Sequence, residues 1–118
     1  MNGSKQGFPD VQEMVLQVAY DLYRYFGIEG ETPSTLFAVG RGHRSPPYKR
    51  QKSKTRAATA YIVQRVLGLS TEELAEQLNK APGTINNYSV VACGYMRNDQ
   101  AFKAKVESLI KAFDSAIR

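Results

Sequence analysis

The spacing of the apolar residues is the feature that most limits what this chain can fold into. In the segments 11–26 and 102–117 they recur every three or four positions, which is the period of an α-helix with one buried face. The stripe in the second segment consists of Phe102, Val106, Leu109, Ile110, Phe113 and Ile117. No segment alternates apolar and polar residues as a half-buried strand does, and no internal repeat is visible. The sequence therefore predicts an all-α fold, a compact helical domain of about five main helices.

Capping residues and glycines predict where these helices begin and end. Asp10 with Glu13, and Ser70 with Glu73, have the spacing of a capping box at a helix N-terminus. The helices predicted in this way cover about 10–26, 55–67, 70–79, 82–95 and 98–117, with at most a short helix in 32–39. We expect residues 1–9 to be a flexible N-terminal tail and residues 10–118 to form a single domain.

Composition excludes several functional classes. The chain has one cysteine, Cys93, and one histidine, His43, so it can form neither an intramolecular disulfide nor the usual His/Cys metal cluster. It contains no catalytic constellation and no GxxxxGK[ST] phosphate loop, and we expect no enzymatic activity, no cofactor and no small-molecule substrate. Because no segment approaches the roughly 18–20 apolar residues of a membrane span and no leader is visible, we expect a cytoplasmic protein that does not bind membranes.

The distribution of charge indicates a polyanionic partner. The net charge is +5, and no carboxylate lies between Thr32 and Thr71. Two glycines and the Pro46-Pro47 pair predict an irregular basic loop over about 40–54. A positive patch on one domain is typical of nucleic-acid-binding proteins, although a run of charge is often only a solvated surface. The candidate DNA-binding residues in and directly after this loop are Arg44, Lys49, Arg50, Lys52, Lys54 and Arg56.

The segment 72–90 has the spacing of a helix-turn-helix. Leu74 and Leu78 give the first helix an apolar face, and Asn79 stands where the turn needs a residue that tolerates positive φ. Ile85 and Tyr88 are expected to face the core from the second helix. The residues that this arrangement directs outward, in the N-terminal half of the second helix, are Gly83, Thr84, Asn86 and Asn87.

The chemistry of this outward end suits duplex DNA. In a helix-turn-helix, the N-terminal half of the second helix enters the major groove. The amide of Asn86 or Asn87 presents a donor and an acceptor together, which matches adenine, and Thr84 can bond a phosphate or a base edge. Unpaired backbone N–H groups near Pro82 and Gly83 can bind a phosphate. Helix pairs of this kind also occur as structural units or protein-binding surfaces, so the pattern leaves those alternatives open.

From Val11 to Phe113 the sequence resembles the C-terminal DNA-binding domain (domain IV) of the bacterial replication initiator DnaA. The segments that carry the resemblance are VAYDLYRYFGI, KSKTRAATAYIVQRVLGLSTEELAEQL and NDQAFKAKVESLIKAF. The resemblance implies that the second helix of the motif reads the major groove, while the basic segment reaches the minor groove and the backbone. It places at recognition positions Lys80, Gly83, Thr84 and Asn87, and on the basic approach Lys49, Arg50, Lys52, Lys54 and Arg56.

The resemblance also implies a bacterial or phage protein of the nucleoid that regulates replication or transcription. This chain departs from the family at the turn, where Lys80-Ala81-Pro82 replaces the family's Arg-Asp-His. We therefore expect duplex DNA binding with a sequence preference unlike that of the standard initiator box. The main alternative is an initiator-like module that binds a replication or transcription protein and no longer reads bases. Structured RNA, held by the basic loop, is a third possibility.

Overall fold

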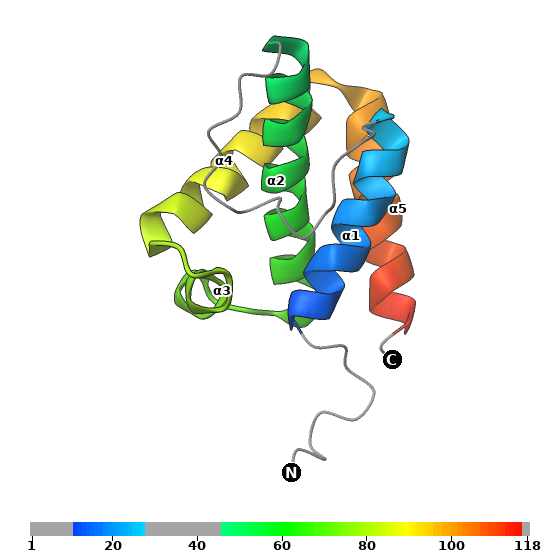
Figure 1. Cartoon of the computed structure of the whole chain (residues 1–118). Coiled ribbons are helices and arrows are strands. Elements are labelled where there is room, and N and C mark those ends of the chain that lie inside the picture. The colour runs from blue at the N-terminus through cyan, green and yellow to red at the C-terminus, as the bar shows by residue number, and fades with distance from the viewer. Residues whose placement is uncertain (1–10, 28–45, 117–118) are drawn as a thin grey trace.

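The described part of the chain folds into helices, and short turns join those that lie between residues 46 and 116 (Figure 1). The structure, a computed structural model, describes residues 11–27 and 46–116, and side chains in the second range from Gln51 onward. The helices are α1 (Val11–Phe26), α2 (Pro46–Leu67), α3 (Thr71–Leu78), α4 (Pro82–Asn98) and α5 (Gln100–Ala116). No strand occurs in these two ranges. The predicted all-α fold is thus confirmed, while the predicted tail at 1–9 and the short helix at 32–39 lie outside the described residues.

Helix α2 is the centre of the fold, because it packs against each of the other four helices (Figure 1). It has 22 residues and is therefore about 33 Å long, which is enough to cross the whole domain. Alanines at Ala57, Ala58 and Ala60 are fully buried and let neighbouring helices approach its backbone closely. Ile62 and Val63 are also fully buried and fill the space further along the helix. The core therefore surrounds the second half of α2 instead of lying on one side of it.

The predicted basic loop is wrong where the structure describes it. Helix α2 begins at Pro46, not at Thr55, so residues 46–54 are helical. The Pro46-Pro47 pair predicts a break in helical structure, but proline is well suited to the first turn of a helix, where backbone N–H groups have no intrahelical acceptor. No glycine or proline follows until Gly68, so nothing interrupts the helix once it has started. Residues 40–45, the rest of that predicted loop, lie outside the described part.

Helices α1 and α5 cover α2 with the apolar faces that their spacing predicted. In α1, Met14, Val18 and Leu22 are buried, and in α5 Phe102 and Val106 are fully buried. Helix α5 starts one residue after Asp99, whose carboxylate accepts a hydrogen bond from the Phe102 N–H at 3.1 Å. This cap explains why α5 begins where it does. The N–H groups of the first turn have no acceptor within the helix, and the Asp99 carboxylate supplies one of them with an acceptor.

The connection between α3 and α4 is fixed by hydrogen bonds at both ends of α3. Ser70 and Glu73 form the predicted capping box, with bonds of 3.0 and 2.8 Å. At the other end Asn79 adopts the left-handed conformation with φ of 57°. The Lys80 N–H then donates to the Ala75 carbonyl at 2.9 Å, which together with the bond from Asn79 to Glu76 forms a Schellman motif. Only residues 79–81 separate the two helices.

Lys54 is partly buried between helices, contrary to its expected place on a solvent-exposed loop. Its Nζ is 3.7 Å from an Asp99 carboxylate oxygen, and its side chain is only 25% exposed. The ammonium also lies 5.0 Å from the ring centre of Tyr95, with Phe102 at 5.4 Å and Phe26 at 5.9 Å. These distances fall within the range of cation–π attraction. Lys54 therefore ties α2 to the ends of α1 and α4 and to the start of α5.

We expect the left-handed turn to depend on the residue type at position 79. Asn79→Ala should lower the free energy of unfolding by about 1 kcal/mol, because alanine tolerates positive φ less well than asparagine. Asn79→Gly should match or exceed the wild type, since glycine adopts this conformation without a steric cost. The midpoints of urea denaturation, compared at a constant m-value, measure the stability of both variants. Equal midpoints for the two variants would contradict this account of the turn.

We expect Lys54→Gln to lower the free energy of unfolding by about 1–2 kcal/mol, because it removes an ion pair and a cation enclosed by three aromatic rings. Lys111→Gln is the matched control, since Lys111 is an exposed lysine of α5 without such contacts. Thermal and urea denaturation of both variants provide the measurement. A Lys54 variant as stable as the Lys111 variant would show that Lys54 has no such role.

Candidate nucleic-acid interface

The exposed face of α4 carries residues that the helical period predicted to point away from the core. Gly83, Asn86 and Asn87 are exposed, while Ile85 between them is buried and anchors the helix in the core. Thr84 and Lys80 are half-buried beside this face. Val90, which is not among the predicted site residues, is 62% exposed one turn further along. Its spacing of four residues from Asn86 was the signal that could have found it.

The N-terminus of α4 has no side-chain cap of its own. Its N-cap residue is Ala81, which has no side-chain acceptor, and Pro82 follows at the first helical position. Within the described residues, the Gly83 N–H has no hydrogen-bond acceptor. A Cβ added at Gly83 would meet nothing within 4 Å, so the backbone here is open to an approaching molecule. An exposed helix N-terminus with a free N–H group favours a negatively charged ligand.

The basic residues predicted upstream divide into three groups in the structure. Lys52 and Arg56 are half-buried on α2, one helical turn apart, and both have interactions within the protein. Lys54 faces inward, as described above. Lys49 and Arg50 belong to the first turns of α2, but their side chains lie outside the described part, as does all of Arg44. The predicted set therefore does not form one continuous loop surface.

Arg56 lies close enough to Tyr88 of α4 for its charge to act on the phenol. Burial raises the pKa of Tyr88 above its usual value, and the positive charge of Arg56 partly opposes this effect. The phenol is accordingly neutral at physiological pH. The pair brings the basic half of α2 alongside the middle of α4, so that one cation of the predicted set lies next to the helix that carries Asn86 and Asn87.

The described ranges contain neither a cluster of metal-ligating side chains nor a helix that could span a membrane. Among residues 11–27 and 46–116, no three of the His, Cys, Asp and Glu residues gather closely enough to hold a metal ion. Likewise, none of the helices in this part of the chain has both the length and the apolar character that crossing a membrane requires. The exposed thiol of Cys93 lies in the second half of α4.

Comparison of the chain with known protein families, with curated proteins and with solved structures found no match. The geometry of α4 and α2, together with the chemistry of their exposed residues, is therefore the basis for any functional conclusion.

Proposed function

We propose that this protein binds double-stranded DNA without catalysing a reaction. In this proposal α3 and α4 act as a helix-turn-helix, and the N-terminal half of α4 enters the major groove. The observation that carries the proposal is the exposed, uncapped and polar start of α4, at Gly83, Asn86 and Asn87. The basic half of α2 would lie along the flanking phosphate backbone.

The composition of this end of α4 supports the proposal, because its residues do little for the protein itself. Glycine and asparagine are poor residues for a helix interior, by about 1 and 0.5 kcal/mol relative to alanine. Asn86 and Asn87 are exposed, and their side-chain amides have no hydrogen-bond partner among the described residues. The major groove offers each amide the paired donor and acceptor of an adenine edge. DNA binding thus gives a role to residues that packing leaves without one.

Electrostatics supports the same partner. The net charge of +5 favours association with a polyanion, and release of counterions from DNA supplies binding free energy for each phosphate neutralised. Lys52 and Arg56 are only half-buried, so their intramolecular contacts leave part of each side chain accessible. Lys54 has no part in this proposal, because its ammonium is held by Asp99 and the surrounding aromatic rings.

The resemblance to the DNA-binding domain of the replication initiator supports duplex DNA as the ligand and regulation of replication or transcription as the role. Ala81 and Pro82 have no side-chain hydrogen-bonding groups, so base reading would fall to Thr84, Asn86 and Asn87. We therefore propose a target sequence that includes adenines and differs from the standard initiator box. Selection of bound duplexes from a random pool tests both the binding and the preference.

We expect Asn87→Ala to reduce discrimination between the selected duplex and a scrambled duplex by about 1–3 kcal/mol, because it removes a bidentate base contact. Arg50→Ala should instead weaken binding to both duplexes alike and lower the slope of log K against log salt by about one. Fluorescence anisotropy over a range of salt concentrations measures these quantities. Ser108→Ala, at an exposed position of α5, is the control.

Three outcomes would contradict the proposed function. One is an affinity for duplex DNA that does not change with salt. Another is identical behaviour of the Asn87 and Arg50 variants on the two duplexes, which would overturn the separation of base reading from phosphate binding. The third is the absence of any duplex-induced shift in the amide resonances of Thr84, Asn86 and Asn87, which would favour the alternative of a protein-binding module.

Gly83→Ala tests whether DNA approaches the backbone at the start of α4. The added methyl group meets nothing in the protein, so stability should stay equal or rise by up to about 1 kcal/mol. Affinity for duplex DNA should fall by about 1–2 kcal/mol, because the methyl group occupies the space of the approaching strand. Gly94→Ala is the matched control, since it lies on the same helix and is equally unobstructed. Equal affinities of the two variants would refute close approach at Gly83.

A further inference from the structure

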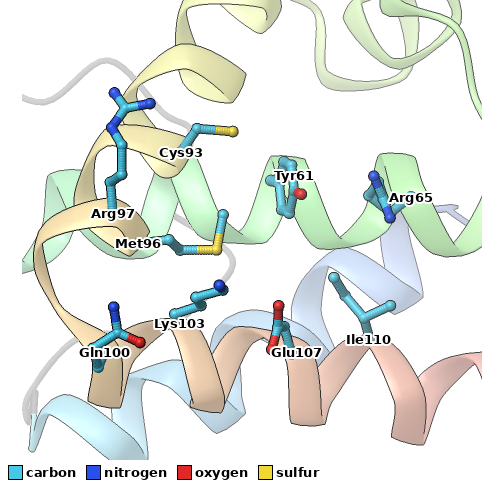
Figure 2. A pocket seen from close by; sticks show the side chains of 9 residues that line it. All are labelled: Tyr61, Arg65, Cys93, Met96, Arg97, Gln100, Lys103, Glu107 and Ile110. Atoms are coloured by element: carbon cyan, nitrogen blue, oxygen red, sulfur yellow. The ribbon is translucent and has the colours of Figure 1, made fainter.

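A cleft of about 330 Å³ lies between α2, α4 and α5 (Figure 2). Its polar lining includes three cationic side chains from three different helices, Arg65, Arg97 and Lys103, and one carboxylate, Glu107. Three positive charges and one negative charge give this lining a net charge of +2. Tyr61, Met96 and Ile110 supply the apolar part of the lining.

The cations of this cleft have no carboxylate partner in the described part of the chain. The ion pairs of Arg24 with Asp21 and of Lys54 with Asp99 lie outside the cleft. Arg65 has its guanidinium 5.7 Å from the ring centre of Tyr61. Arg65, Arg97 and Lys103 are all exposed. Unpaired cations that gather around one hollow favour an anionic ligand, since each raises the local positive potential.

The cleft is continuous with the face of α4 that carries the asparagines. Asn86, Val90, Cys93 and Arg97 follow one another at spacings of four, three and four residues, which places them along one stripe of the helix. All four are exposed. Cys93 and Arg97 at the end of this stripe also line the cleft, and Lys103 reaches toward it from α5 (Figure 2).

The distance along this stripe fits the dimensions of the major groove. Asn86 and Arg97 are eleven residues apart, which is about 16 Å along the helix axis. The major groove is about 12 Å wide, so a helix whose Asn86 reaches a base edge has Arg97 beyond the groove, at the level of a bordering strand. The residues nearest to that strand are then the cations of the cleft.

We propose that this cleft binds neighbouring phosphates of the DNA backbone on the side of α4 away from Arg56. The inference rests on the proposed function, and it adds a second backbone contact that the basic half of α2 does not provide. In the proposed complex, Arg97 and Lys103 neutralise phosphates, and Arg65 extends the positive surface along α2. Glu107 weakens binding, because its carboxylate repels the phosphates. The duplex would be held by cations on both flanks of α4.

The test combines variants that change charge in opposite directions. The double variant Arg97→Gln with Lys103→Gln should lower the slope of log K against log salt by about two and weaken duplex binding on the order of tenfold. Glu107→Gln should strengthen binding severalfold, which damage to the fold would not produce. The matched controls are Lys111→Gln on α5 and Glu13→Gln on α1, both exposed and outside the cleft. Thermal denaturation verifies that each variant is folded.

The thiol of Cys93 provides an independent readout, because it is the only cysteine in the chain and it lines the cleft. Bound duplex should slow its alkylation by N-ethylmaleimide, a neutral reagent that the phosphates do not repel. Each variant is compared with and without duplex, because nearby charges themselves affect the reactivity of a thiol. In the double variant, the same fraction of bound duplex should protect the thiol less. Inorganic phosphate at millimolar concentration should give no comparable protection, which distinguishes a DNA backbone from a free anion.

The outcomes separate this inference from the proposed function. If the wild type binds duplex DNA but the double variant retains the wild-type affinity and salt slope, the cleft assignment is overturned while DNA binding stands. If the wild type binds no duplex DNA, both fail. Protection of Cys93 by a polyglutamate peptide, with duplex binding unchanged in the double variant, would assign the cleft to an acidic protein segment and overturn the assignment to DNA.

Discussion

The packing of α2 against all the other helices is the constraint on which the rest of the structure depends. A helix in that position must be narrow where its neighbours cross it, and the buried alanines Ala57, Ala58 and Ala60 meet this requirement. Because α2 also carries six of the sixteen lysine and arginine residues, more than any other helix, the same helix that organises the core determines where much of the positive charge can emerge. Lys54 shows how the two roles of α2 compete. It lies where α1, α4 and α5 meet, and its ammonium is surrounded by aromatic rings and Asp99 instead of contributing to the positive surface.

The orientation of α4 follows from two local features and one buried side chain. The Schellman motif at Asn79 and Lys80 ends α3 sharply, and α4 begins two residues later. Ile85 then joins the core cluster with Leu74 and Leu78, which fixes the rotation of α4 about its own axis. Once that rotation is fixed, the helical period requires Asn86 and Asn87 to face outward, with Cys93 and Arg97 on the same stripe as Asn86. The candidate interface is thus a consequence of how α4 is anchored.

Sequence patterns predicted the helical parts of this fold well where the signals were local. The capping box at Ser70 and Glu73, the left-handed Asn79 and the buried stripes of α1 and α5 depend on neighbouring residues and were all found. The prediction was wrong at Pro46-Pro47, because proline both ends helices and starts them, and only the position of the following helix distinguishes the two uses. The cleft lined by Arg65, Arg97 and Lys103 was missed because its cations are separated by up to 38 positions in the chain.

The sequence by itself determined the all-α class, the ends of α3 and the residues of α4 that face outward, because helix periodicity, capping and positive φ are settled within a few residues. Only the tertiary structure decided the surroundings of each basic side chain. It turned Lys54 inward, set Arg56 beside Tyr88, and brought Arg65, Arg97 and Lys103 around one cleft. The physical reason is that the environment of a long charged side chain depends on which helices pack around it, and that packing joins residues far apart in the chain.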